Sequence, residues 1–179
     1  MKRLFSMLLI ALLASSFAFG EQAKTPQNAQ KDIFNLTTIT GKKIKIYGTV
    51  KGMEVPQYKG KVLLIEFWGT HCPPCRKSIP HYINIMKNYS KDVALIAIEA
   101  QNTPKGSLAD FAKSRGINYD VVSTQDGNDF IEYVAQRARW NGSIPFLIIV
   151  DKKGEVVTMQ VGLVPEANII KVLKQLIAK

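Results

Sequence analysis

The sequence is poor in the residues that form disulfides or bind metal ions in small domains, with two cysteines and two histidines among its 179 residues. Any internal disulfide must therefore join Cys72 to Cys75. A ring this short constrains the unfolded chain very little, so a purely structural disulfide is disfavoured. A zinc site would need these thiols together with His71 and His81, but His71 adjoins Cys72 and His81 falls outside the usual ligand spacings. We therefore expect no metal at this pair.

The sequence also lacks a basic run with interleaved aromatic residues, although its formal net charge is +10. Its lysines are spread along the chain, which indicates a soluble basic surface rather than a nucleic-acid site. Weak attraction to anionic membrane surfaces stays open as an alternative. Covalent haem attachment requires histidine directly after the second cysteine, and Arg76 stands there. We therefore expect neither nucleic acid nor haem as a partner.

The apolar stretch near the N-terminus, residues 4–14, is short for a membrane span, which needs about 20 residues. It follows Lys2 and Arg3 and precedes the small residues at 18–20, the pattern of a secretory signal. We predict a signal peptide over residues 1–20, with an uncleaved membrane anchor as the alternative. No cysteine lies near the cleavage point for lipid attachment. Residues 21–32 are predicted to be a flexible leader before one domain over residues 33–179.

What the chain does contain is two thiols in one short segment, Cys72-Pro73-Pro74-Cys75. They follow an almost continuous apolar run, Lys61–Trp68, which predicts a strand buried on both faces. Two thiols at the start of a helix after such a strand are typical of a thioredoxin-like redox site. Exported proteins commonly use cysteines as staples, but a single close pair is better explained as a reagent. We therefore expect the chain to exchange electrons through this pair.

Hydrophobic periodicity predicts one mixed α/β domain in which strands and helices alternate before a final hairpin and helix. Glycine-containing and lysine-containing turns separate these elements. The predicted elements are an N-terminal hairpin over 33–47, strands over 61–68, 93–99 and 119–123, helices over 74–89, 107–115 and 126–139, a hairpin pairing 145–151 with 155–161, and an amphipathic helix over 166–178.

Several segments together resemble the exported thioredoxin-like reductases of the TlpA, ResA and DsbE (CcmG) type. They are the Phe34-x-Leu36 start, the run from Lys59 to Thr70, the two cysteines with Pro80 beyond them, and Ile144-Pro145 before the apolar Phe146-Leu147-Ile148. The resemblance implies a thioredoxin fold, a mixed central sheet flanked by helices, with an N-terminal β-hairpin and an extra central segment. It also implies a periplasmic location, protein thiols and disulfides as substrates, a membrane electron donor of the DsbD or CcdA type, and cytochrome c maturation as the pathway.

The chain departs from that family pattern at three positions. His71 stands directly before the first cysteine, where these proteins usually carry Trp. Ser78 stands three places beyond the second cysteine, where ResA-type proteins usually carry an acid. Glu66 stands where many of them carry Asn. We therefore expect that the acid function has moved and that the partner surface differs.

Only a thiolate attacks a disulfide, so one cysteine of the pair must be accessible and acidified. Cys72 would gain from the free N–H groups and the dipole at the helix N-terminus, whereas Cys75, one turn inside, is suited to resolving the mixed disulfide. Pro73 and Pro74 have no N–H, which removes two of the nearest donors to the Cys72 sulfur; we also count both as substrate-contacting residues. A moderately stabilised thiolate makes a poor oxidant, which favours a reductase.

Glu66 interrupts the apolar strand, and a carboxylate is costly to bury without a partner or a role. In the family template its position lies beneath the cysteines, where a carboxyl of raised pKa would relay a proton to or from Cys75. The alternative is a glutamate at the strand's end that reaches solvent or pairs with a lysine. We therefore place Glu66 with Cys72 and Cys75 as the candidate catalytic residues.

The remaining candidates would contact the substrate. Pro145 resembles the cis-proline that faces the active cysteines in this fold, with Ile144 offering its backbone to an extended peptide; a trans proline at a strand start is the alternative. Trp68 is expected beside the motif, either contacting the substrate or packing in the core. His71 would tune Cys72 or contact the partner, unless it is simply an exposed neighbour.

Together these residues predict an exported thiol:disulfide oxidoreductase, acting mainly as a reductase of protein disulfides, with no cofactor beyond the Cys72–Cys75 disulfide. One alternative is an oxidase or isomerase of disulfides. A peroxidase is disfavoured because the Pro-x-x-x-Thr-x-x-Cys setting of a peroxidatic cysteine is absent. Another alternative is a non-catalytic copper-binding or metallochaperone module that uses the two thiols, and metal content after purification would distinguish it.

Overall fold

A computed structural model of the chain describes residues 32–178. The predicted signal peptide and nearly all of the predicted leader lie outside the described residues, so both stay predictions. The first element is a small antiparallel sheet of three strands, β1 (Ile33–Thr37), β2 (Lys43–Gly48) and β3 (Met53–Glu54). Its β1–β2 hairpin is the one that the alternating sequence predicts.

The second sheet has five strands in the order β6-β5-β4-β7-β8. The strands β4, β5 and β6 are parallel, whereas β7 runs antiparallel to β4 and β8 antiparallel to β7. Every residue of β4, β5 and β7 is buried, as expected for strands covered on both faces. Their bounds are β4 (Val62–Trp68), β5 (Val93–Glu99), β6 (Asp120–Val122), β7 (Phe146–Val150) and β8 (Val156–Val161).

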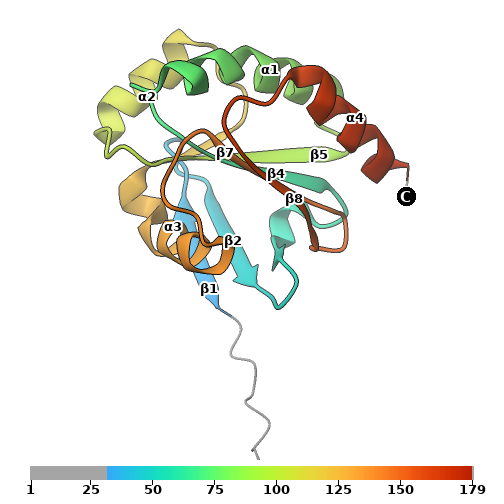
Figure 1. The fold of residues 1–179 in the computed structure, drawn as a ribbon. Helices are drawn as coiled ribbons and strands as arrows, with labels where there is room; N and C mark the ends of the chain where they lie inside the picture. The colour runs from blue at the N-terminus through green and yellow to red at the C-terminus, as the bar shows by residue number, and fades with distance from the viewer. Residues whose placement is uncertain (1–31, 179) are drawn as a thin grey trace, which may run out of the picture. The chain divides into compact units, whose positions relative to one another are not determined.

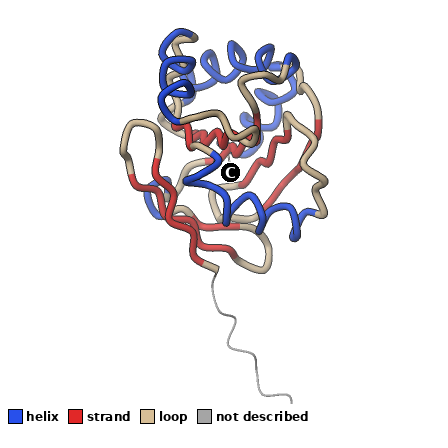
Figure 2. The backbone as a smooth tube through the Cα atoms, turned by 90° about the vertical axis from the view of Figure 1, so that its left-hand side faces the viewer, coloured by secondary structure: helices blue, strands red, loops and turns tan. Residues whose placement is uncertain are grey.

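Four helices and the hairpin cover this sheet from both sides: α1 (Pro73–Tyr89), α2 (Lys105–Ser114), α3 (Thr124–Ala138) and α4 (Glu166–Ile177). Figure 1 shows α1, α2 and α4 on one face, and α3 with β1 and β2 on the other; Figure 2 shows the same layers after a quarter turn. Because side chains alternate along a strand, Leu64 joins the core under α1 and α4 while Ile65 joins the core over α3. The cysteines belong to the first of these two cores.

The pair α2–β6 is inserted between β5 and α3, and it extends the sheet beyond β5. This insertion is the extra central segment that the family resemblance implies. The mixed sheet, the flanking helices and the N-terminal hairpin also agree with the predicted fold.

Most predicted boundaries differ from the observed ones by one or two residues, and two short elements were not predicted. The helix α3 begins two residues before the predicted start, because Ser123 caps it: its Oγ accepts a hydrogen bond from the N–H of Asp126 at 3.3 Å. The helix α2 also begins earlier, at Lys105, after an N-cap Pro104 that offers no side-chain hydrogen bond. The strand β3 and a 3-10 turn over Pro56–Tyr58 are too short to produce a periodic pattern.

The small sheet contacts the large one at both of its edges. Thr38 forms a bridge to Val122 of β6, and Gly52 forms another to Glu155, just before β8. The second approach is close, because a Cβ at Gly52 would stand 2.3 Å from the carbonyl oxygen of Gly154. The small sheet and its connecting turns therefore reach both edges of the large sheet.

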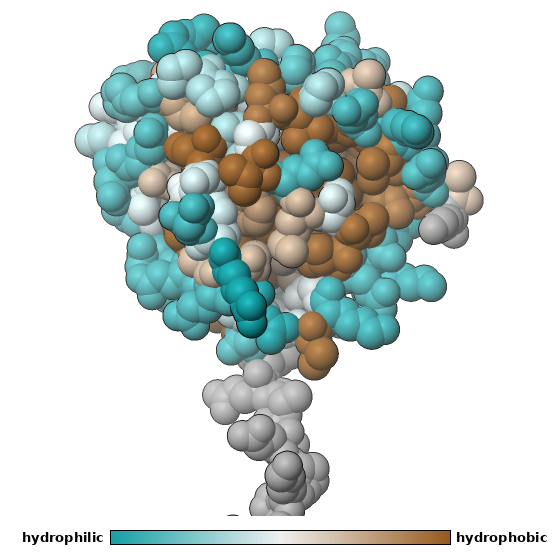
Figure 3. All heavy atoms as spheres, viewed as in Figure 1, coloured by the Kyte–Doolittle hydropathy of each residue, from teal (hydrophilic) through white to brown (hydrophobic). Residues whose placement is uncertain are grey.

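The edge strand β8 carries exposed apolar side chains at alternate positions, Val157, Met159 and Val161, between 46% and 58% exposed. Figure 3 shows apolar residues gathered on the face where β8 runs, among hydrophilic ones. An exposed edge strand of this kind is open to pairing with another chain. Across residues 32–178, none of the helices combines the length and apolar character that crossing a membrane requires.

Candidate active site

The two cysteines form a disulfide with an S–S distance of 2.04 Å at the start of α1. Cys72 is the N-cap residue, with an extended backbone, and its Sγ accepts a hydrogen bond from the N–H of Cys75 at 3.2 Å. Cys72 is 6% exposed, whereas Cys75 is fully buried inside the first turn. Cys72 is therefore the more exposed of the two cysteines, as the predicted attacking role requires, and that role stays a prediction.

The prolines limit the hydrogen bonding available to the Cys72 sulfur. An N-cap side chain accepts from the second or third residue of its helix. Pro74 is the second residue and has no N–H, so the third, Cys75, makes the bond that is observed. In addition, the carbonyl oxygen of Ile144 lies 3.8 Å from Cys72 Sγ. A carbonyl dipole pointing at the sulfur disfavours negative charge there, so both features weaken a thiolate at Cys72.

Glu66 is 1% exposed, in the middle of β4, where its cross-strand neighbours are Ala97 and Leu147. Burial among apolar neighbours raises the pKa of this carboxyl from 4.5 to about 8, although hydrogen bonds from Ser78 and Tyr82 oppose the rise. The carboxyl is therefore protonated around neutral pH. The alternative of a solvent-exposed glutamate at the strand's end is wrong.

Ser78 joins Glu66 to the cysteine pair. Its hydroxyl lies 2.9 Å from Glu66 Oε1 and 2.7 Å from the carbonyl oxygen of Cys75. A single side chain of α1 thus contacts both the buried carboxyl and the backbone of the buried cysteine. Proton exchange between Glu66 and the Cys75 thiol stays a prediction.

Sequence reasoning missed two tyrosines in this buried cluster. The pKa of Tyr82 and that of Tyr119 are both raised well above the usual range, first by burial and then by the nearby Glu66 carboxyl. Their rings are 6.2 Å apart, edge to face. Tyr82 could have been found, because it lies seven residues after Cys75 and so on the same face of the helix. Tyr119 comes from the α2–β6 insertion, and no local pattern links it to Glu66.

The Ile144–Pro145 peptide bond is cis, as predicted. Pro145 is buried and Ile144 is half-buried. The 3.8 Å contact between the Ile144 oxygen and Cys72 Sγ brings this loop directly to the redox pair. The backbone at 144 is therefore placed where a peptide bound at Cys72 would meet it.

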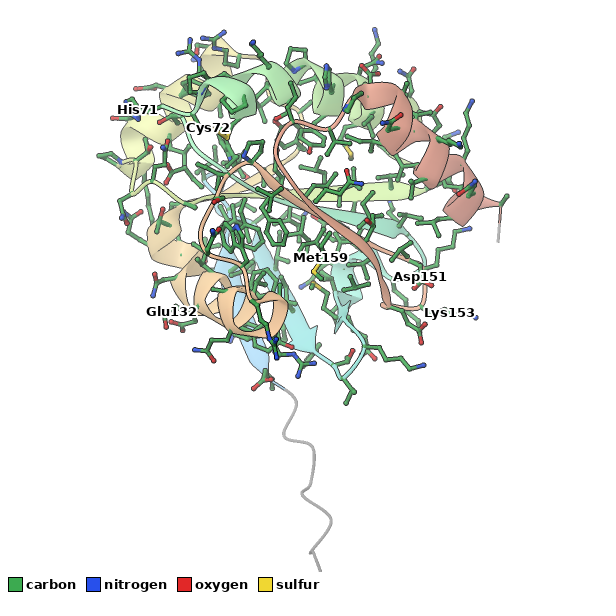
Figure 4. All side chains as sticks on the ribbon, in the orientation of Figure 1. His71, Cys72, Glu132, Asp151, Lys153 and Met159 are labelled. Carbon is green, nitrogen blue, oxygen red and sulfur yellow. A yellow bond between two sulfur atoms is a disulfide. The ribbon has the colours of Figure 1, made fainter. Side chains whose placement is uncertain are left out.

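Trp68 and His71 differ in their surroundings. Trp68 is 1% exposed and packs in the same core as both cysteines, with its ring 5.8 Å from that of Phe111. Its Nε1 has no hydrogen-bond partner among the described residues, so packing holds the ring in place. His71, by contrast, is exposed, and Figure 4 shows it beside Cys72 at the N-terminal end of α1. Of the two predicted contacts, His71 is the one that an incoming partner can reach.

Within residues 32–178, no three His, Cys, Asp or Glu side chains lie together as a metal site would require. In that part of the chain, a metal-binding alternative would rest on the Cys72 and Cys75 thiols alone.

Comparison with known proteins gives the site a family context. The Redoxin family matches residues 40–176. The chain is 30% identical over 120 residues to the thiol-disulfide oxidoreductase ResA of Bacillus subtilis (strain 168), a match over 66% of this chain and 63% of that protein. It is 27% identical over 113 residues to the ResA of Halalkalibacterium halodurans, over 63% of this chain and 60% of that protein. The chain thus spans less than two thirds of either relative.

Among solved structures, the chain resembles a thiol:disulfide interchange protein of the thioredoxin family from Chlorobium tepidum. The TM-score is 0.63 at 23% identity, over 82% of this chain and 94% of that one. Together with the strand order, this likeness confirms the predicted thioredoxin fold.

Proposed function

Because the chain belongs to the Redoxin family and is a thioredoxin-like protein of the TlpA/ResA type, we propose that it is a thiol:disulfide oxidoreductase that acts mainly as a reductase of protein disulfides. The observation that carries the proposal is the pairing of Cys72, accessible at a helix start, with Cys75, fully buried and joined through Ser78 to the protonated Glu66. One sulfur meets the partner and the other exchanges its proton inside the protein.

In the reductase direction the Cys72 thiolate attacks a partner disulfide and forms a mixed disulfide, and the partner's second sulfur leaves as a thiolate. In the fraction of the reduced protein whose Glu66 is ionised, the Cys75 thiol then passes its proton to this carboxylate as its sulfur attacks Cys72 Sγ, which releases the partner's remaining sulfur as a thiolate. This sequence ends with the disulfide formed and Glu66 protonated, the state that a pKa of about 8 describes.

The preference for reduction is supported by the surroundings of Cys72 Sγ. A thiolate that gains little from the folded protein makes the disulfide comparatively stable, and the couple is then a reductant. Here Pro74 supplies no N–H, and the Ile144 oxygen lies 3.8 Å from Cys72 Sγ.

We further propose that the protein works outside the cytoplasm, in the periplasm, and that a membrane electron donor of the DsbD or CcdA type re-reduces it. The signal-like pattern over residues 1–20 and the family resemblance support this placement. The same resemblance makes apocytochrome c the leading substrate.

The test is equilibration of the purified protein with glutathione buffers, with the Cys72 pKa followed by thiolate absorbance. We expect a reducing couple and a Cys72 pKa that is not strongly lowered, because the sulfur has few donors. An oxidising potential with a strongly acidic Cys72 would instead support the oxidase or isomerase alternative. Stoichiometric copper in the purified protein would support the metal-binding alternative.

A further inference from the structure

The structure buries a second carboxylate, Glu99, at the end of β5, and the mechanism above does not use it. Its side chain is fully buried and receives four hydrogen bonds. Oε1 accepts from the N–H of Gln101 at 3.0 Å and from the hydroxyl of Thr103 at 2.8 Å. Oε2 accepts from the N–H of Thr103 at 3.0 Å and from the hydroxyl of Thr124 at 2.7 Å. Two donors thus face each oxygen, and the single hydroxyl hydrogen of Thr124 is shared between Oε2 and the Glu99 carbonyl oxygen, which also lies 2.7 Å away.

A chain of hydroxyl groups leads from Glu99 to the entrance of the active site. Thr103 Oγ1 lies 2.8 Å from Thr70 Oγ1, and Thr70 Oγ1 lies 3.0 Å from His71 Nδ1. Thr70 and Thr103 are each 6% exposed, so this chain is protected from water. Its outer end, His71, is exposed beside Cys72 (Figure 4).

The carboxylate sets the direction of every hydrogen bond in the chain. Thr103 gives its only hydroxyl hydrogen to Glu99, so its oxygen can only accept from Thr70. Thr70 has then used its own hydrogen, so its oxygen can only accept from His71 Nδ1–H. A neutral His71 therefore carries its proton on Nδ1 and a lone pair on Nε2. A second contact fixes the backbone, because the His71 N–H donates to Gln101 Oε1 at 3.0 Å.

We propose that Glu99, acting through Thr103 and Thr70, is a positioning residue that holds His71 in the Nδ1–H tautomer, so that Nε2 accepts the proton of a partner thiol arriving at Cys72. This inference rests on the proposed function, because it assigns a further role in the same exchange reaction.

The step applies when a partner thiol reduces the Cys72–Cys75 disulfide. The thiol proton passes to His71 Nε2 while the partner sulfur bonds to Cys72 Sγ. The Cys72–Cys75 bond breaks, its electron pair goes to Cys75 Sγ, and Glu66 gives that sulfur a proton. The products are a mixed disulfide at Cys72, a Cys75 thiol, an imidazolium at His71 and a carboxylate at Glu66, so protons and electrons balance.

The direct test is the tautomer of His71, read from the imidazole ¹⁵N chemical shifts of the oxidised protein at a pH where the ring is neutral. With two histidines in the chain, the His71→Asn variant assigns the signals. We expect the Nδ1–H form in the wild type. Thr103→Val frees Thr70 to donate to Nδ1, so we expect the Nε2–H form to gain population there, and Thr103→Ser should restore the wild-type spectrum.

The matched control is Thr124→Val. It removes an equally buried hydroxyl from the same carboxylate, but Thr124 is not on the path to His71. We expect its His71 signals to match those of the wild type. Equal changes in the tautomer population in Thr103→Val and Thr124→Val would overturn the proposal. An unchanged tautomer population in both Thr103→Val and Thr70→Val would overturn it as well. The Thr70→Val variant breaks the same chain one step nearer the ring, which keeps the test decisive if Thr103→Val does not fold.

The kinetic test is the rate at which dithiothreitol reduces the disulfide. We expect His71→Asn and Thr103→Val each to slow the reaction by about tenfold, and the double variant to be no slower, because the two residues act as one unit. Thr124→Val should react at the wild-type rate. An unchanged rate in His71→Asn overturns this inference and leaves the proposed function standing. A wild-type protein that does not exchange thiols at all overturns the proposed function itself.

Discussion

At the residue scale, Glu66 and Ser78 differ in residue type from what the ResA-type resemblance implies at their positions. Those proteins usually carry Asn on the strand and an acid on the helix, whereas this chain carries the carboxyl on β4 and a hydroxyl on α1. The 2.9 Å bond between Ser78 Oγ and Glu66 Oε1 shows that the two positions are in contact. The acid of this chain is therefore anchored in the sheet, in contact with the helix position where the resemblance implies an acid.

The first prediction concerns Glu66→Gln. The amide keeps the shape of the side chain but cannot take the proton of Cys75, so we expect resolution of the mixed disulfide to slow on the order of a hundredfold around neutral pH. Stopped-flow exchange with a disulfide substrate measures this. The control is Glu132→Gln, the same change on the exposed face of α3 (Figure 4). Equal rates for Glu66→Gln and the wild type across pH would leave Glu66 with a structural role alone.

The second prediction concerns Cys75→Ser. Without the buried resolving thiol, a mixed disulfide formed at Cys72 cannot be released, so the variant should accumulate covalent complexes with its partners. Non-reducing electrophoresis of alkylated extracts detects them. Cys72→Ser is the control, and we expect no complexes with it because Cys75 is fully buried. Complexes that need Cys75 rather than Cys72 would reverse the two assigned roles.

At the element scale, the N-terminus of α1 combines a thiol N-cap with prolines at the first two helical positions. Proline suits the first position because no N–H is needed there. At the second position it removes a donor that an N-cap side chain would otherwise use. Pro73 therefore helps to start the helix, whereas Pro74 removes a hydrogen-bond donor from the Cys72 sulfur.

The third prediction follows from that difference. Pro74→Ala adds an N–H within reach of Cys72 Sγ, and a hydrogen bond to a charged group contributes about 1.5 kcal/mol. We therefore expect the couple to become more oxidising by about 30 mV. Pro73→Ala is the matched control, because its restored N–H belongs to the first helical position; its potential should stay near that of the wild type. Equal shifts in the two variants would show that chain stiffness, rather than the donor, sets the potential.

The elements also show how far the sequence could be interpreted. The buried strand, the helix after it and the buried Glu66 were predictable, because an apolar run with one acid and a following thiol pair are local patterns. The Glu99 cluster was not, because its donors come from the loop after β5 and from α3, and only the folded chain brings them together. The early start of α3 was also missed, since Ser123 was assigned to the end of a strand rather than to a cap.

At the scale of the whole molecule, Glu66 makes stability depend on pH. Its pKa is raised from 4.5 in the unfolded chain to about 8 in the folded protein, so between these values the folded state holds a proton that the unfolded chain has released. The stabilisation that comes from protonated Glu66 is thus fully present below pH 4.5, and it is lost as the pH rises to about 8.

The fourth prediction uses this dependence. We expect the unfolding free energy of the oxidised wild type to fall relative to that of Glu66→Gln by up to about 1.4 kcal/mol per pH unit across the window from pH 4.5 to about 8. Urea denaturation of both proteins at several pH values measures the difference, and groups common to both cancel. Parallel curves for the two proteins would mean that Glu66 keeps an ordinary pKa in the folded state.

The small sheet, which contacts both edges of the large one, also constrains the order in which the molecule can assemble during synthesis. A chain is made from its N-terminus, and its early segments fold as their partners become available. The strands β4 and β5 with α1 are close in sequence and can associate early. The small sheet is made before them, yet its bridge from Thr38 to Val122 must wait for β6, and its bridge from Gly52 to Glu155 must wait for the residues just before β8. The first segment of the domain to be synthesised is therefore among the last to reach its final place.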